Sequence, residues 1–110
     1  MGLTYRIYLS GNRIFGCGKC KTHLSTSEHI MSKDFHGKTG RAYLFEDVVN
    51  VTDGPQENRE MRTGLHTVVD IHCCHCGFVV GWKYIKAFAD REKYKEGKYI
   101  LEKMLFQEVV

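Results

Sequence analysis

Cys-Gly-Lys-Cys at residues 17–20 and Cys-Cys-His-Cys at residues 73–76 are the two segments from which the rest of the chain can be understood. Each begins and ends with a cysteine, and 52 residues separate Cys20 from Cys73. Two intervening residues let a tight turn direct both thiolates at one tetrahedral ion about 2.3 Å away. The two pairs therefore predict one four-thiolate site that joins the first third of the chain to the last.

Zinc is the metal that this donor set favours. Four thiolates leave no open position for water, so the site is expected to be structural, and such sites contribute on the order of 10 kcal/mol to folding. Two separate redox C-x-x-C motifs are the alternative, although each of them would need a strand followed by a helix. Gly18 and Gly77 are expected to ease the two turns.

Three side chains beside these motifs leave other ligand sets open. Cys74 is expected to point away from its neighbours as a small, partly buried side chain, with a reactive thiol as the alternative. His72 and His75 flank the second motif, and imidazole is also a zinc ligand. Because four suitably spaced cysteines are present, we expect both histidines to lie outside the ligand set.

The composition is that of a small globular protein. Its 110 residues suit one domain and exclude a two-domain enzyme. Hydrophobic residues make up 43% of the chain, which disordered segments do not reach. The formal net charge of +3 neither demands nor excludes an anionic partner. Because no signal peptide pattern and no apolar run of membrane-spanning length occur, we expect an intracellular, soluble protein.

Apolar alternation and turn residues along the chain predict a mostly antiparallel β architecture. Strands are expected over residues 5–9, 13–16, 41–51, 57–62, 67–72, 78–84 and 98–106. Residues 34–40 are expected to form a loop and residues 52–55 a turn, because both contain glycine and polar residues. Residues 87–95 form the only expected helix.

Six blocks of residues carry a resemblance to a known family. They are Cys-Lys-Thr-His-Leu-Ser at 20–25, Gly-Arg-Ala-Tyr-Leu-Phe at 40–45, Val-Val-Asn-Val at 48–51, Thr-Gly-Leu-His-Thr-Val at 63–68, Gly-Trp-Lys-Tyr at 81–84 and Tyr-Lys-Glu-Gly-Lys at 94–98. Over residues 14–103 the chain resembles the Yippee family of small eukaryotic zinc proteins. The resemblance implies a β-tent, in which two antiparallel sheets meet at an angle, with at most one short helix near 87–95.

The resemblance also implies a metal site and a domain organisation. One structural zinc ion per chain pins the two sheets, and its ligands by position are Cys17, Cys20, Cys73 and Cys76. Residues 14–106 form the zinc-binding domain. Residues 1–13 form an N-terminal extension or strand, and residues 107–110 form a C-terminal tail.

A candidate ligand pocket comes from a related β-tent, the thalidomide-binding domain of cereblon. Residues 81–84 resemble the segment that supplies part of the aromatic cage of that domain. Strand alternation would place Trp82 and Tyr84 on one face, with His66 and Tyr43 closing the sides. Such a cage suits a flat imide, a cation or a modified side chain. Alternatively, Trp82 and Tyr84 only cover the core.

The expected function is that of a non-enzymatic protein-interaction module. B-type methionine sulfoxide reductases share the tent but need a nucleophilic cysteine on a late strand, and this chain has no cysteine after Cys76. The resemblance implies an accessory or adaptor role in a multisubunit ubiquitin ligase, in nucleus and cytoplasm. Residues 83–103, with seven basic and four acidic side chains, are the candidate docking face.

A second function is kept as the alternative. In it, the protein reads a small ligand or a modified or terminal peptide group in the aromatic pocket around Trp82. The expected partners are therefore other proteins, with a small molecule or peptide as a further candidate. Membranes and nucleic acid are not expected, because acidic residues interrupt the basic ones and no basic stripe occurs.

Overall fold

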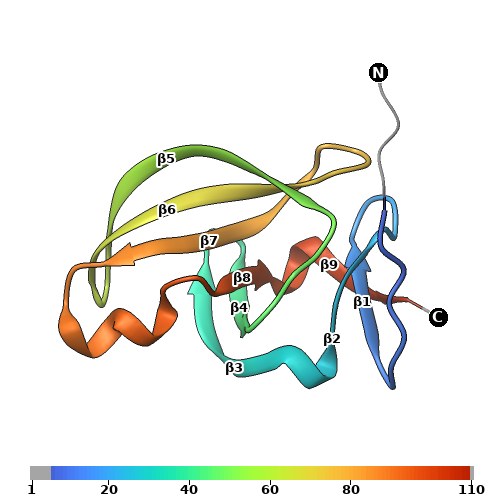
Figure 1. Ribbon diagram of the computed structural model, residues 1–110, viewed down its shortest axis with the longest axis horizontal. Coiled ribbons are helices and arrows are strands. Elements are labelled where there is room, and N and C mark those ends of the chain that lie inside the picture. The colour runs from blue at the N-terminus through green and yellow to red at the C-terminus, as the bar shows by residue number, and fades with distance from the viewer. Residues whose placement is uncertain (1–5, 110) are drawn as a thin grey trace.

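Two antiparallel sheets make up the computed structural model of the protein, which describes residues 6–109 (Figure 1). The smaller sheet has the strand order β2-β1-β9 and the larger sheet has the order β3-β4-β8-β7-β6-β5. The strands are β1 (Ile14–Cys17), β2 (His23–Thr26), β3 (Ile30–Gly37), β4 (Gly40–Phe45), β5 (Val51–Met61), β6 (Gly64–Cys73), β7 (Val79–Ala87), β8 (Tyr99–Glu102) and β9 (Phe106–Val109). The predicted fold class is confirmed.

Helical structure in the described residues is limited to three short 3-10 helices. They are η1 (Ser27–His29), η2 (Asp90–Lys95) and η3 (Lys103–Leu105). The helix expected over residues 87–95 corresponds to η2, whereas η1 and η3 are single turns that the sequence did not indicate. Within residues 6–109 we find no helix with the length and apolar character needed to cross a membrane.

The strands expected over 57–62 and 67–72 correspond to parts of the long hairpin β5–β6, but two expected breaks between strands are wrong. Pairing of Glu57 with Val68 belongs to the long hairpin β5–β6. The turn expected at 52–55 lies inside β5, which passes Pro55 with a bulge between Asp53 and Gln56. A proline is tolerated there because β5 is an edge strand. The loop expected at 34–40 is mostly strand as well, since β3 extends to Gly37.

Two expected strands also differ from the structure. The strand expected over 41–51 ends at Phe45, and residues 46–50 turn toward β2, where the Val49 amide donates to the Leu24 carbonyl at 2.8 Å. Of the strand expected over 5–9, residues 6–9 are described and are not strand. There the Ile7 amide donates to Asn50 Oδ1 at 2.8 Å instead of pairing with a strand.

The final strand bears on the predicted domain organisation. Residues 106–109 form β9, which pairs with β1 so that Ile14 lies opposite Val109 and Cys17 lies opposite Phe106. The expected start of a C-terminal tail, at residue 107, falls within this strand. The smaller sheet therefore brings the first described strand next to the last one (Figure 1).

Register in the larger sheet sorts its side chains onto two faces. Residues paired across neighbouring strands point to the same face of a sheet, so one row across the sheet contains Tyr43, Leu101, Gly81 and Ile71. The residues that follow or precede these by one position along each strand point to the opposite face. They form a second row, which contains Leu44, Ile100, Trp82 and Asp70. Leu101 packs into a core cluster with residues of the smaller sheet, whereas Trp82 belongs to a separate cluster on the opposite face.

Candidate metal centre and aromatic cavity

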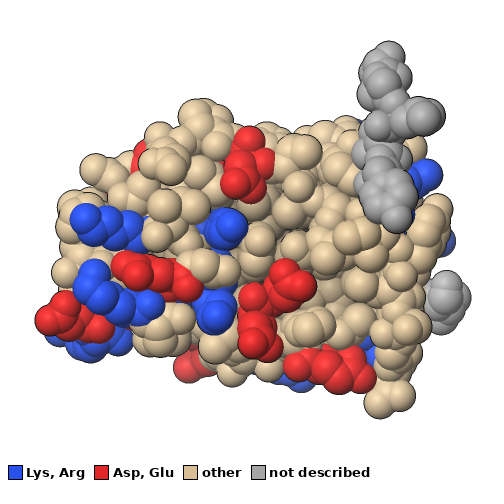
Figure 2. Space-filling model, viewed as in Figure 1, with Lys and Arg blue, Asp and Glu red and all other residues tan. Residues whose placement is uncertain are grey.

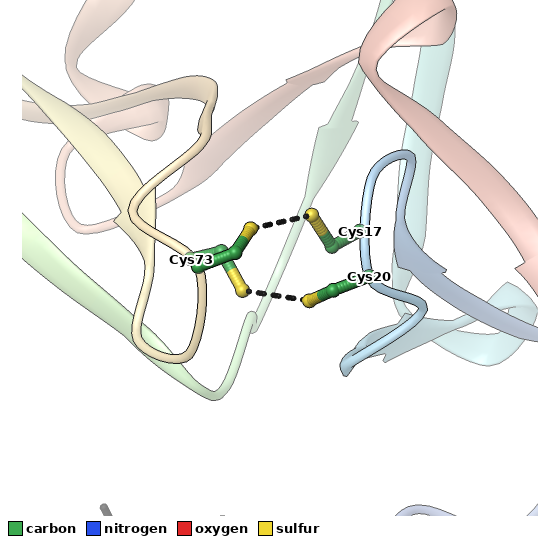
Figure 3. Close-up of side chains that lie close together, drawn as sticks. Cys17, Cys20 and Cys73 are labelled. Atoms are coloured by element: carbon green, nitrogen blue, oxygen red, sulfur yellow. Dashed lines mark hydrogen bonds between the residues drawn. The ribbon is translucent and has the colours of Figure 1, made fainter.

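The two cysteine motifs lie at corresponding places in the two sheets. Residues 17–20 form the turn between β1 and β2 of the smaller sheet, and residues 73–76 form the turn between β6 and β7 of the larger sheet. Figure 3 shows the two turns facing each other, with their thiols directed into the gap between them. A metal ion held there would join one sheet directly to the other.

Four sulfur atoms converge at this point. Cys17 Sγ lies 3.6 Å from Cys76 Sγ, and Cys20 Sγ lies 3.5 Å from Cys73 Sγ. All four sulfurs lie within 4.8 Å of one another. Ligands 2.3 Å from a tetrahedral ion are about 3.8 Å apart, so the cluster has the size and the donor set of a four-thiolate zinc site. The predicted set of Cys17, Cys20, Cys73 and Cys76 is therefore placed to hold one zinc ion.

Both turns have the same backbone design. In each, the amide four residues after the first cysteine donates to the carbonyl of that cysteine at 2.9 Å, from Lys21 in the first turn and Gly77 in the second. These two residues have positive φ angles of 67° and 79°. Gly77 eases its turn as predicted. Gly18 has another role, because a Cβ at that position would lie 2.7 Å from the Leu105 carbonyl oxygen.

Hydrogen bonds and burial act in opposite directions on the thiols of the first motif. Burial raises the pKa of Cys17 to about 12. At Cys20 burial also disfavours the thiolate, but hydrogen bonds from the Thr22 hydroxyl, 3.0 Å from the sulfur, and from the Thr22 amide lower the pKa to about 7. Zinc binding removes these differences, because a coordinating thiol is deprotonated outright.

The remaining candidate ligands stay outside the cluster. His72 Nδ1 lies 3.3 Å from the Gly77 carbonyl oxygen, and His75 is exposed. Cys74 is half-buried, burial raises the pKa of its thiol, and its amide donates to the Asn50 carbonyl at 2.9 Å. Among residues 6–109, the group that converges as a candidate metal site consists of the four predicted cysteines alone.

The four candidate pocket residues are not all brought together. Trp82 and Tyr84 lie side by side with ring centroids 6.2 Å apart, and both line a cavity of about 740 Å³ on the face opposite Leu101. His66 is fully buried, with its ring centroid 5.2 Å from that of Tyr84, and does not line the cavity. Tyr43 lies on the other face and packs against Phe106. We call this space the Trp82 cavity.

Two buried nitrogens near the cavity have no hydrogen-bond partner within the described residues. The indole Nε1 of Trp82 is one of them, although Trp82 is only 6% exposed. The other is His66 Nε2, whose ring donates from Nδ1 to the Gly64 carbonyl at 2.9 Å. Burial raises the pKa of Tyr84 to about 12, so its hydroxyl stays protonated at neutral pH. Trp82 and Tyr84 therefore offer hydrogen-bond donors in the cavity wall, whereas His66 lies outside it.

Lys95 is a cavity residue that the sequence analysis missed. Although it is a lysine, it is only 2% exposed, and its Nζ donates to Glu92 Oε1 at 2.7 Å and to Thr63 Oγ1 at 3.0 Å. Its ammonium also lies 5.2 Å from the ring centroid of Phe35 and 5.3 Å from that of Tyr84. The (i, i+3) spacing of Glu92 and Lys95 was a signal for an ion pair, but not for its burial.

We expect the substitution Lys95→Met to destabilise the zinc-loaded protein by about 1.5–3 kcal/mol, because it removes the charged hydrogen bond to Glu92 and leaves that carboxylate only Arg91, 3.7 Å away, as an ion-pair partner. The hydrogen bond from Lys95 holds the pKa of Glu92 below its usual range. The folded protein therefore favours the charged form of Glu92, and this preference weakens when Lys95 is removed. Urea unfolding measures the loss.

The control for this substitution is Lys93→Met on the same 3-10 helix. Lys93 and Glu96 form a partly exposed pair, which contributes about 0–1 kcal/mol. The double variant Glu92→Gln/Lys95→Met should recover part of the loss. Equal effects of Lys93→Met and Lys95→Met would contradict a buried ion pair.

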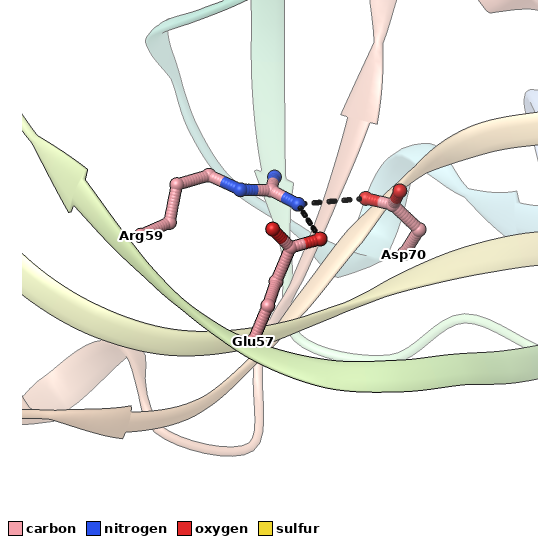
Figure 4. A network of polar contacts seen from close by, with 3 residues as sticks. All are labelled: Glu57, Arg59 and Asp70. Carbon is pink, nitrogen blue, oxygen red and sulfur yellow. Dashed lines mark hydrogen bonds and ion pairs between the residues drawn. The ribbon is translucent and has the colours of Figure 1, made fainter.

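A second charged network borders the cavity. Arg59 Nη2 donates to Glu57 Oε2 at 2.7 Å and to Asp70 Oδ1 at 3.3 Å (Figure 4). Burial disfavours the guanidinium charge, but these two carboxylates outweigh it and raise the pKa of Arg59. Since Asp70 pairs with Trp82 across β6 and β7, the network ties the edge strand β5 to the wall of the cavity.

Comparison with known proteins gives consistent matches. The family model described as "Yippee zinc-binding/DNA-binding /Mis18, centromere assembly" matches residues 13–109. A yippee-like protein of Solanum tuberosum is 55% identical over 103 residues, covering 94% of this chain and 79% of that protein. Human protein yippee-like 3 is 51% identical over 100 residues, covering 90% of this chain and 84% of that protein.

A solved structure is similar in fold. The crystal structure of the Mis18 "Yippee-like" domain superposes with a TM-score of 0.69, covering 89% of this chain and 95% of that one. Its sequence identity is 17%, so this likeness concerns the fold alone.

Proposed function

Because the chain belongs to the Yippee zinc-binding and Mis18 family, we propose that it acts as a non-enzymatic protein-interaction module and, more specifically, as an accessory or adaptor subunit of a multisubunit ubiquitin ligase in nucleus and cytoplasm. The observation that carries the non-enzymatic role is the metal site. Four thiolates complete the coordination of a zinc ion and leave no position for water or substrate. The ion then serves the scaffold, and recognition is left to its surface.

The proposed docking face is the exposed part of the segment 83–103, at the end of β7 and along η2. The segment also contains β8, whose residues Ile100, Leu101 and Glu102 are buried and do not belong to the face. Figure 2 shows basic and acidic side chains gathered over the end of the molecule that η2 occupies. Among them Phe88 is 46% exposed, with the Lys86 ammonium 4.8 Å from its ring centroid. An exposed aromatic residue within mixed charges has the composition of an interface centre with a polar rim.

We expect ubiquitin ligase subunits to be captured in stoichiometric amounts with the wild-type protein, and to be lost with Phe88→Ser. If Phe88 is an anchor at the centre of the interface, removing its ring should cost about 2 kcal/mol, which is about a thirtyfold loss of affinity. Affinity capture from the native cells at near-physiological expression, followed by mass spectrometry, is the measurement.

The matched control is Met104→Ser, at a residue that is 74% exposed and lies just outside the proposed face. One zinc ion per chain in each bait establishes that all three are folded. If ligase subunits do not accompany the wild-type protein, the adaptor role is wrong. If they remain with Phe88→Ser, the docking face is wrong.

The Trp82 cavity favours a second candidate function, which is the recognition of a small ligand or a peptide group. Its support is a space of about 740 Å³ bounded by two aromatic side chains of one strand, with a buried indole donor that has no partner in the described part of the chain. Of the four residues that the sequence predicted for the pocket, Trp82 and Tyr84 line the cavity and belong to this second candidate function. His66 lies behind Tyr84, and Tyr43 lies outside the cavity.

A further inference from the structure

The aromatic rings of the Trp82 cavity already have a cation beside them. Lys95 Nζ lies 5.2, 5.3 and 6.0 Å from the ring centroids of Phe35, Tyr84 and Tyr94. Glu92 and Thr63 hold that ammonium in place by hydrogen bonds of 2.7 and 3.0 Å. A second cation at these rings would face the positive charge of Lys95 at short range, which disfavours it. The cavity is therefore unsuited to an ammonium ligand.

The basic side chains that line the cavity outnumber the acidic ones. Arg59 and Lys95 are paired with carboxylates, but Lys38 and Arg62 have no ion-pair partner within residues 6–109. Asp34 is the unpaired acid among the described lining residues. Lys38 and Arg62 are both exposed, so they lie where an incoming ligand meets the cavity. Their charges attract an anion.

Hydrogen-bonding capacity points to the same kind of ligand. Trp82 Nε1 is buried and makes no well-aligned hydrogen bond in the described residues, although it lies near enough to the Tyr84 hydroxyl to oppose the burial that raises the pKa of Tyr84, and an indole nitrogen can only donate. A ligand acceptor atom that reached this buried donor would give it a well-aligned hydrogen bond. Beside this donor the wall is apolar, with Phe35, Met61 and Tyr84. The matching ligand has an acceptor oxygen, a negative charge and an apolar body.

We propose that the Trp82 cavity binds a carboxylate group attached to an apolar body, with Trp82 Nε1 donating to a carboxylate oxygen and Lys38 and Arg62 attracting its charge. This inference rests on the second candidate function and names the ligand class for that site. A free peptide C-terminus and a small organic acid share this chemistry. The experiment separates these two sources.

The test uses NMR spectroscopy of the zinc-loaded full chain. Trp82 is the only tryptophan of the chain, so the indole N–H signal reports on the cavity without ambiguity. The probes are acetyl-Gly-Phe with a free carboxylate, the same dipeptide as its C-terminal amide, phenylacetate, and trimethyllysine. We expect the dipeptide acid to shift the indole signal in a saturable way, with at least tenfold weaker binding of the amide. Saturable binding of phenylacetate as well indicates a small-acid site, and its absence indicates a peptide C-terminus.

Two variants test the assigned residues. Trp82→Phe keeps an aromatic ring but removes the donor, and should weaken binding of the dipeptide acid about tenfold, read from amide signals of β7. Arg62→Gln should weaken it severalfold, and the effect should shrink at high salt. The control is Arg13→Gln, because the side chain of Arg13 is 51% exposed, pairs with Glu108 and does not line the cavity. Zinc content confirms that each variant is folded.

Several outcomes would overturn the proposal. Equal binding of acid and amide removes the role of the carboxylate, and unchanged binding by Trp82→Phe removes the role of the indole. Binding of trimethyllysine in place of the acids also overturns the ligand class, but it leaves a ligand-recognition function standing. If none of the probes shifts the indole signal, the carboxylate proposal fails. The interaction-module proposal is then still decided by the capture experiment, which does not depend on the cavity.

Discussion

Removal of zinc is expected to unfold the whole protein. The ion joins the β1–β2 turn of the smaller sheet to the β6–β7 turn of the larger sheet, so it is the cross-link between them. Structural zinc contributes on the order of 10 kcal/mol, which is comparable to the entire stability of a domain of this size. A strong chelator at neutral pH should abolish the β-sheet circular dichroism and release one zinc ion per chain, measured with a colorimetric indicator.

Adjacent cysteines of the second motif provide a matched pair of variants for this prediction. Cys73→Ser should bind no zinc and lack the native spectrum, whereas Cys74→Ser should keep one zinc ion and lose less than about 1 kcal/mol. Full zinc binding by Cys73→Ser would contradict the assigned ligand set, and would point to His72 or His75 as a replacement ligand. Loss of zinc from Cys74→Ser would equally contradict it.

Gly81→Ala is expected to prevent folding, or to destabilise the protein by at least about 4 kcal/mol. Gly81 lies in β7 between Ile71 of β6 and Leu101 of β8. A Cβ atom built there overlaps the carbonyl oxygen of Ile100, and this neighbour is backbone that cannot rotate away. The two central strands of the larger sheet would have to separate. Urea unfolding of the zinc-loaded protein measures the effect.

Gly97→Ala is the control. Gly97 is also a glycine, but it lies on the connection between β7 and β8 and not inside a strand. Gly97 has a φ of +80°, and a Cβ there meets no atom within 4 Å. The cost is then only the left-handed backbone conformation, about 1 kcal/mol. If Gly81→Ala is no more destabilising than Gly97→Ala, the packing of β7 against β8 described above is wrong.

Two of the errors in the predicted strands, at residues 52–55 and 34–40, have the same physical origin. Pro55 and its neighbours read as a turn, and residues 34–40 read as a loop, because local turn chemistry was the only information at those positions. In the folded chain both segments belong to edge strands, β5 and β3, where a bulge or a missing donor costs little. Pairing with a neighbouring strand overrides the local preference.

The metal site and the β class followed from the amino-acid sequence alone, whereas the cavity depends on tertiary structure. Spacing within Cys17–Cys20 and Cys73–Cys76 already directs each pair of thiols at one ion, so the ligands were readable locally. The face on which Tyr43 lies follows from its pairing with Leu101, and one residue of shift would reverse it.

Burial of Lys95 is the clearest case of a property that only the assembled fold sets. Its ammonium meets Thr63 and Phe35, which lie about 30 and 60 residues away along the chain. No local pattern distinguishes this lysine from the exposed Lys93 two positions earlier. Charge and spacing are properties of the sequence, but the neighbours that desolvate a charge are chosen by long-range strand pairing.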